Sequence, residues 1–204
     1  MKRIVWMALL ALALPLSALA NDVDFSNTGG TLSGSSAGLT LTGSNITGII
    51  GMGLGTCSTA VPCGSLTFTT AALTSGDTVN GATFAAGGTF TITSNGTDGI
   101  AAGTIFNGTF SGPVSWSTPG TIGVDGTIEY ILSGKVSGTW SDGTTVAGTT
   151  VQLTFNTGTG GFQGSVALAS GDTVITTVPE PGTLGLLGTG LVGLAGILRR
   201  KLKA

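Results

Sequence analysis

The chain has 204 residues, which suits one domain of ordinary size together with targeting segments. Only 8% of the residues are charged, 37 are Gly and none is His, so the composition excludes a highly charged disordered chain. Between the two ends Lys135 is the only base, which excludes the basic surface that nucleic-acid binding requires.

The first twenty residues predict a cleaved signal peptide. Lys2 and Arg3 form a basic start, residues 4–14 are apolar, and Ala18 and Ala20 fit an A-x-A cleavage site. A proline follows the short apolar run, which favours a cleaved segment over a permanent anchor helix. We therefore expect an exported protein whose mature chain begins after Ala20.

Residues 21–177 predict one exported all-β domain. Apolar residues alternate with Thr at a period of two, as in half-buried strands, along residues 39–42, 66–69, 89–93 and 151–155. Dipeptides that accept the positive φ of tight turns separate such runs: Asn80-Gly81, Asn95-Gly96, Asp98-Gly99, Asn107-Gly108, Asp125-Gly126 and Asp142-Gly143. Their spacing indicates an antiparallel sandwich or barrel. We expect the sandwich, of jelly-roll or Ig-like type, with residues 21–34 as a loose N-terminal arm.

Two short segments of this domain resemble each other. Residues 73–79 read Leu-Thr-Ser-Gly-Asp-Thr-Val and residues 168–174 read Leu-Ala-Ser-Gly-Asp-Thr-Val. The echo fits either an old duplication or the same turn chemistry used twice, and the second explanation is favoured because no fixed repeat period accompanies it.

Cys57 and Cys63 are the only cysteines in the chain. In an exported protein, the natural expectation is one disulfide that closes residues 58–62 into a small loop. A metal site needs more ligands than two thiolates, and the chain has no His to supply them. We therefore expect a structural disulfide, no metal site and no cofactor.

The catalytic motifs in the domain are weak. Residues 34–38 read Gly-Ser-Ser-Ala-Gly and match the G-x-S-x-G pattern of a nucleophile elbow, but a chain without His has no Ser-His-Asp triad. Asp125 and Glu129 are the nearest carboxylate pair, and Glu129 lies on the polar-leaning face of a predicted strand, residues 127–132. We expect no catalytic residues. A polymer hydrolase remains the alternative, and it requires two carboxylates that face one cleft.

Trp116, Tyr130 and Trp140 are the candidate ligand-contacting residues. Exposed aromatic rings on a sheet can stack on sugars, whereas Trp116 shares a strand face with Val114 and Trp140 shares one with Val136. That phase favours burial in the core. Exposed, coplanar rings would support polysaccharide binding, and buried rings would remove its basis.

Residues 178–204 predict a membrane-sorting segment. Residues 182–198 are apolar and uncharged, and a helix of this length spans ~26 Å, the short end of a transmembrane helix. Four cations follow it at once, which keeps this end cytoplasmic and the preceding domain outside. The segment thus has three parts: the Pro-Glu-Pro motif at Pro179, Glu180 and Pro181, the apolar span 182–198, and the stop-transfer cations Arg199, Arg200, Lys201 and Lys203.

These three parts in this order resemble the PEP-CTERM sorting signal of Gram-negative bacteria that make exopolysaccharide. The resemblance implies that exosortase, a membrane-embedded cysteine protease, recognises Pro179, Glu180 and Pro181 and cuts near them. It also implies a protein held in the inner membrane by its C-terminal helix and then found at the cell surface or outside the cell.

The expected function follows from these signals. We expect a non-enzymatic surface or extracellular-matrix protein associated with biofilm and exopolysaccharide, with a polysaccharide-binding module or a polymer hydrolase as alternatives. The expected partners are an exosortase-type protease, the membrane and exopolysaccharide, and no nucleic acid.

Overall fold

The computed structural model describes residues 21–51, 57–97, 99–118 and 127–177, together with Gly188 and Gly190, which are helical. Asp22–Thr176 forms one compact unit. No helix within these described ranges has the length and apolar run that crossing a bilayer requires. The predicted features outside the described residues are the cleavage site at Ala18 and Ala20, the Pro179, Glu180 and Pro181 motif, the cations Arg199, Arg200, Lys201 and Lys203, and nearly all of the 182–198 span.

The described residues form thirteen strands and one short 3-10 helix, η2 (Gly158–Gly160). The strands are β1 (Asn21–Thr28), β2 (Thr31–Ser35), β3 (Gly38–Ile50), β4 (Gly64–Thr69), β5 (Leu73–Asp77), β6 (Gly81–Phe84), β7 (Phe90–Ser94), β8 (Gly103–Phe110), β9 (Val114–Ser117), β10 (Glu129–Trp140), β11 (Thr145–Asn156), β12 (Ser165–Ala167) and β13 (Ser170–Thr177). The all-β expectation is confirmed.

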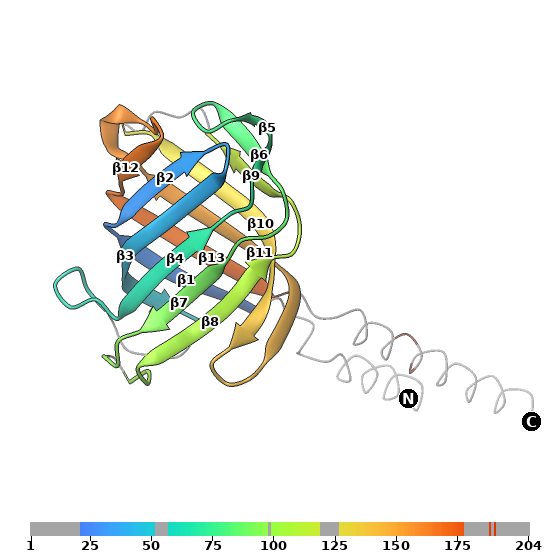
Figure 1. Ribbon diagram of the computed structural model, residues 1–204. Helices are drawn as coiled ribbons and strands as arrows, with labels where there is room; N and C mark the ends of the chain where they lie inside the picture. Colours follow the sequence, from blue (N-terminus) through green and yellow to red (C-terminus); the bar gives the residue numbers. More distant parts are fainter. Residues whose placement is uncertain are drawn as a thin grey trace, which may run out of the picture. The chain divides into compact units, whose positions relative to one another are not determined.

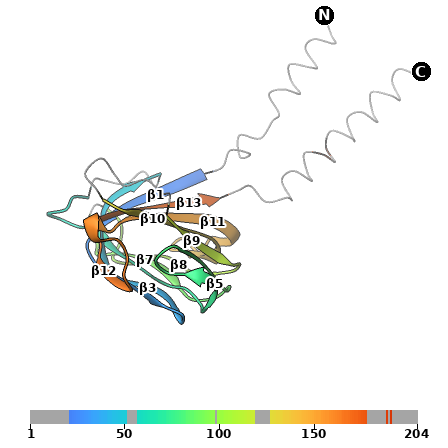
Figure 2. The same ribbon diagram turned by 90° about the horizontal axis from the view of Figure 1, so that it is seen from above.

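One antiparallel sheet closes on itself as a barrel of eight strands. The strand order is β11-β13-β1-β3-β4-β7-β8-β10, and the pairing of β10 with β11 completes the ring. β9, β6 and β5 continue from one part of β10, while β2 and β12 add to one part of β3 (Figure 1). The first and last strands of the barrel, β1 and β13, lie side by side (Figure 2).

The expected sandwich is not confirmed, because its two separate sheets are replaced by this single closed one. Strand alternation and turn signals are local, and they are the same in both architectures. Long strands distinguish the barrel from the sandwich here. Gly38–Thr42 of β3 pairs with β2 and Asn45–Ile50 pairs with β1, so one strand joins two parts of the sheet, and its pairing with β4 shifts register between Leu41 and Ser44. Such shifts bend a sheet toward closure.

The loose N-terminal arm expected at residues 21–34 is wrong. Residues 21–28 form β1, which pairs with β3 on one side and with β13 on the other. Val23 and Phe25 are buried, while Asp24 between them lies on the opposite face. The alternation is short and interrupted by Asp, Asn and Ser, and its strand forms because barrel closure supplies partners on both edges.

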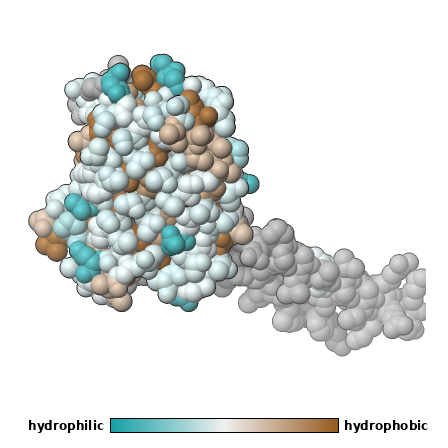
Figure 3. Space-filling view, viewed as in Figure 1, coloured by the Kyte–Doolittle hydropathy of each residue, from teal (hydrophilic) through white to brown (hydrophobic). Residues whose placement is uncertain are grey.

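The core consists of the apolar residues that alternate along the strands. Leu39, Leu41, Leu66 and Phe68 are buried as predicted, as are their counterparts on β7 and β11. The Thr residues between them face outward, and the face shown in Figure 3 is accordingly mostly pale, of intermediate hydropathy. The outward hydroxyls also pair across strands, with Oγ of Ser65 2.8 Å from Oγ1 of Thr93.

One of the predicted turns lies in the middle of a strand. Asn107 and Gly108 belong to β8, where Asn107 pairs with Thr91 on one side and with Thr139 on the other. A Cβ at Gly108 would lie 2.8 Å from the backbone oxygen of Ser137. This glycine therefore permits close strand approach rather than a turn.

Candidate functional site

The aromatic candidates do not form an exposed platform. The rings of Trp116 and Tyr130 stack at a centroid separation of 4.7 Å and an angle of 8°, but the side chains are only 1% and 3% exposed. Nε1 of Trp116 donates to the backbone oxygen of Thr78 at 2.9 Å, and Oη of Tyr130 accepts from the backbone N–H of Phe162 at 2.9 Å. Both polar tips are thus satisfied within the barrel, and neither ring is available to a sugar.

Trp140 lies at the far end of β10, away from that stack in sequence. Its ring packs on Phe106 with centroids 4.8 Å apart, and the side chain is half-buried against the core. A single half-buried ring lacks the coplanar partner that sugar stacking on a platform needs. The hypothesis of an aromatic polysaccharide site therefore loses its structural basis at these three residues.

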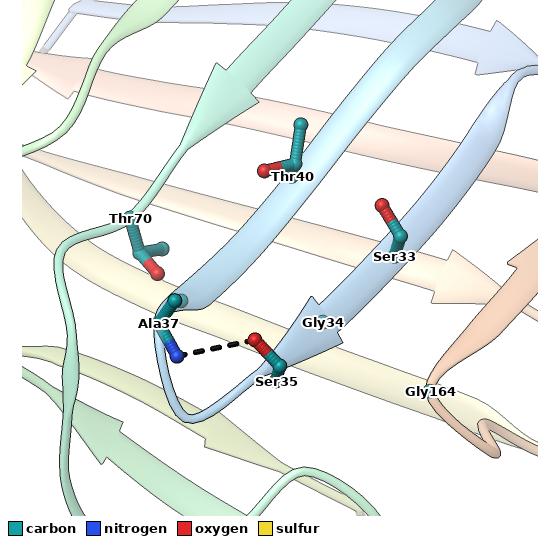
Figure 4. Close-up of a pocket in the computed structure, with 8 residues that line it drawn as sticks. Ser33, Gly34, Ser35, Ala37, Thr40, Thr70 and Gly164 are labelled. Carbon is teal, nitrogen blue, oxygen red and sulfur yellow. Dashed lines mark hydrogen bonds between the residues drawn. The ribbon is translucent and has the colours of Figure 1, made fainter.

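An open cavity of about 280 Å³ lies at the β2–β3 hairpin (Figure 4). Most of the Gly-Ser-Ser-Ala-Gly segment lines this cavity. The turn of this segment connects two antiparallel strands instead of a strand and a helix. Its lining consists of small residues, hydroxyl-bearing or without polar side-chain groups: Ser33, Gly34, Ser35, Ala37, Gly38, Thr40, Thr70 and Gly164.

The hydroxyls of this cavity already serve the hairpin itself. Oγ of Ser35 accepts from the N–H of Ala37 at 3.1 Å, the bond drawn in Figure 4. Oγ1 of Thr70 accepts from the N–H of Leu39 at 2.9 Å and donates to the oxygen of Ala71 at 3.1 Å. A serine in this lining has no titratable neighbour to take its proton, so the cavity offers neutral hydrogen bonds and no activated nucleophile.

The carboxylates of the exposed turns have structural partners. Oδ1 of Asp77 accepts from the backbone N–H groups of Asn80 at 2.7 Å and Val79 at 2.9 Å, and these bonds lower the pKa of Asp77. Oδ1 of Asp142 accepts from the N–H of Thr144 at 2.8 Å, which lowers the pKa of Asp142 in the same way. Both are turn-stabilising carboxylates.

The nearest carboxylate pair in the sequence, Asp125 and Glu129, is not tested by the described residues. Glu129 is exposed on β10 opposite Asn156 of β11, and Asp125 lies outside the described residues. The structure instead pairs Asp24 of β1 with Asp172 of β13, on neighbouring strands. Burial, a hydrogen bond to Asp172 and the charge of Asp172 together raise the pKa of Asp24 to about 6.

Sequence reasoning missed this pair because it depends on barrel closure. The two aspartates lie near opposite ends of the domain sequence, and each by itself looks like a solvated acid on a strand. In the structure each aspartate lies on the outward face of its strand, beside buried neighbours, but nothing local predicts that the first and last strands pair.

The predicted disulfide between Cys57 and Cys63 is confirmed, with the two Cα atoms 5.4 Å apart. Within the closed loop the N–H of Ser58 donates to the oxygen of Val61 at 3.2 Å, and the N–H of Val61 donates to Oγ of Ser58 at 3.1 Å. The N–H of Cys63 also donates to the oxygen of Ile46 at 2.9 Å, which ties the loop to β3. The disulfide is a structural feature of the loop that joins β3 and β4.

The comparisons with known proteins assign the C-terminus. Residues 177–201 match the family model of the PEP-CTERM protein-sorting motif, so the resemblance seen in the sequence is confirmed. No curated protein and no solved structure matches the chain. The motif implies export, anchoring of the C-terminus in the membrane before processing, and processing by exosortase.

Proposed function

We propose that this chain is a surface or extracellular-matrix protein, sorted by exosortase, whose barrel acts without catalysis in a biofilm or exopolysaccharide matrix. The observation that carries the proposal is the position of the sorting motif. Its match begins at Thr177, which is also the last residue of β13. All thirteen strands therefore precede Pro179, Glu180 and Pro181, and a cut near these residues delivers the barrel whole.

Several features of the barrel support a non-catalytic role. The chain has no His, and the Ser-containing cavity is lined by neutral groups. The carboxylates of Asp77 and Asp142 stabilise turns through backbone hydrogen bonds. The side chains that carry chemistry are thus largely used to hold the fold.

A second candidate function, binding of a neutral polysaccharide, is favoured by the outward side chains. Thr67, Thr91, Asn107, Thr139 and Thr145 follow one another across β4, β7, β8, β10 and β11 in directly paired positions. Oγ1 of Thr91 donates to Oδ1 of Asn107 at 3.1 Å, so neighbours in this row are mutually oriented. We name these five residues the hydroxyl row. Uncharged donors and acceptors at strand spacing, ~4.8 Å, suit hydrogen bonding to a neutral sugar polymer.

The sorting proposal is tested by intact-protein mass spectrometry of membrane and medium fractions from the native host. The expected product begins at Asn21 and ends near Pro181. Glu180→Gln should abolish this product, because it alters the motif that exosortase recognises. Glu129→Gln is the matched control, since Glu129 and Glu180 are the only glutamates and Glu129 lies exposed on β10.

A chain that still runs to Ala204 in the membrane, in wild type and in both variants, would contradict processing and leave the C-terminus as a permanent anchor. The matrix role is tested separately. We expect the processed barrel in the washed exopolysaccharide fraction of a biofilm, and recovery only from the cell-free medium would contradict association with the matrix.

A further inference from the structure

The inner face of the β1–β13 junction carries buried polar side chains in an otherwise apolar core. Asn27 of β1 is 2% exposed and Thr173 of β13 is 0% exposed. Oδ1 of Asn27 and Oγ1 of Thr173 have no hydrogen-bond partner among the described residues. Burying such a group without a partner is costly, so these two atoms require an explanation.

The two side chains lie on the same inner face of neighbouring strands, at diagonally offset positions. Nδ2 of Asn27 donates to Oγ of Ser44 at 2.6 Å, which fixes the amide against β3. A Cβ at Gly171 would lie 2.8 and 2.9 Å from the two amide atoms of Asn27, so the amide lies directly over this glycine. Thr173 is the next residue of β13 on the same face, ~6.8 Å further along the strand.

This spacing suits one small bridging molecule. Two hydrogen bonds of ~2.8 Å each let one water join atoms up to about 5.6 Å apart, and side chains that extend toward each other from diagonal strand positions ~7–8 Å apart come within that limit. Exchange of the amide atoms of Asn27 changes nothing, because either orientation leaves one amide atom directed away from Ser44. The bridging group must donate to the amide oxygen of Asn27, and it can either donate to the Thr173 hydroxyl or accept from it.

We propose that an ordered water molecule binds inside the barrel between Asn27 and Thr173. Its surroundings are neutral, with Ser44 as the third polar side chain and Phe25 and Ile175 as apolar neighbours along the same strand faces. Buried waters occupy sites of this kind, where they satisfy polar groups that have no protein partner. A neutral pair of oxygens offers too few ligands for a calcium ion.

The water has a structural consequence for the fold. β1 and β13 meet from opposite ends of the domain sequence, and a slip of one residue would turn the inward side chains of β13 outward. Such a slip separates Thr173 from Asn27 and leaves both side chains without a hydrogen-bond partner. The bridge thereby favours one register of closure over its neighbours.

Thr173→Val tests the proposal, because valine has nearly the same shape and lacks the hydroxyl. If water joins Thr173 to Asn27, the variant breaks that bridge, and the unfolding equilibrium constant of the full-length chain in denaturant rises by about tenfold. If the hydroxyl has no partner at all, the same substitution leaves stability unchanged or raises it, and this result overturns the proposal.

Thr70→Val is the matched control. Thr70 is also buried, and its hydroxyl is held by Leu39 and Ala71, so its loss destabilises the protein whether or not the interior contains water. Nuclear magnetic resonance supplies an independent reading. Cross-relaxation between a long-lived water and the amide protons of Asn27 is expected in wild type and in Thr70→Val and is lost in Thr173→Val, and its absence in wild type would also overturn the proposal.

Discussion

Asp24 and Asp172 face each other across the junction of the first and last strands, and burial of Asp24 together with the nearby Asp172 carboxyl raises the pKa of Asp24 to about 6. Lys135, the one base between the chain ends, is on β10 and pairs with Thr150 of β11. Because two like charges this close disfavour ionisation of both acids, the pair retains a proton, and the protonated carboxyl can donate to the other.

This arrangement predicts that the barrel loses stability as pH rises through the range from about 4 to about 6. The pKa of Asp24 is raised from 3.8 to about 6, so in this range the folded chain binds more protons than the unfolded chain. The stabilising contribution is complete below about pH 4 and is gone above about pH 6. Denaturant unfolding at a series of pH values measures it.

Asp24→Asn should flatten this pH dependence, because the amide cannot ionise and still donates to Asp172. Asp22→Asn, on an exposed neighbour of the same strand, is the control and should retain the slope. A slope that persists unchanged in Asp24→Asn would mean that another group carries it.

Tyr130→Phe is expected to cost about 1–3 kcal/mol of unfolding free energy. The ring and its stacking on Trp116 remain, but the N–H of Phe162 loses its acceptor in a buried setting. Denaturant unfolding gives the value, and Trp140→Phe, at a half-buried position, should cost less. A neutral Tyr130→Phe would show that solvent reaches the Phe162 amide.

Replacing Cys57 and Cys63 together by Ser should lower stability by about 2 kcal/mol, the chain-entropy estimate for so short a loop. The same loss should follow reduction of the wild type, whereas a reducing agent should leave the double variant unchanged. Thermal unfolding with and without reductant compares the two. An effect of reductant on the double variant would point to some cause other than this bond.

Gly108→Ala should destabilise the barrel by about 1–3 kcal/mol, because the added methyl meets the backbone of β10 and forces the strands apart. Gly112→Ala is the matched control: its Cβ would meet only the Cβ of Lys135, at an ordinary 3.9 Å. Denaturant midpoints of the two variants should differ clearly. Equal midpoints would mean that β8 and β10 adjust without cost.

If the hydroxyl row binds neutral polysaccharide, the joint change of Thr91 and Thr139 to Ala should weaken retention on insoluble cellulose several-fold. The control changes Thr150 and Thr176 to Ala, a directly paired couple on β11 and β13 outside the row. Retention is measured by co-sedimentation with folded protein. Equal retention of both variants and wild type would place any binding elsewhere, without bearing on sorting by exosortase.

Local signals predicted much of the fold. The alternation of Leu66 and Phe68 with Thr on β4 identified residues that are buried, and Asp142-Gly143 does lie in the turn between β10 and β11. These features depend on neighbours in sequence, where period and turn preference carry the information.

Closure and the site geometry depend on contacts that no short segment encodes. The repeated Ser-Gly-Asp-Thr-Val shows why: residues 75–79 leave β5 and enter a turn, while residues 170–174 remain within β13. The same residues adopt different structures because β13 has partners on both sides, β11 and β1. The pairing of Asp24 with Asp172 follows from that context and from nothing nearer.

The adjacency of β13 and the sorting motif links the position of the cut to closure of the barrel. Only Val178 separates the last strand residue from Pro179, so a cut made a few residues too early removes part of β13. Such a product loses part of the pairing of β13 with β11 and β1, which leaves unpaired backbone groups on both neighbouring strands at that end of the barrel. Cleavage at the motif therefore leaves the barrel closed, whereas cleavage within β13 leaves it open at this junction.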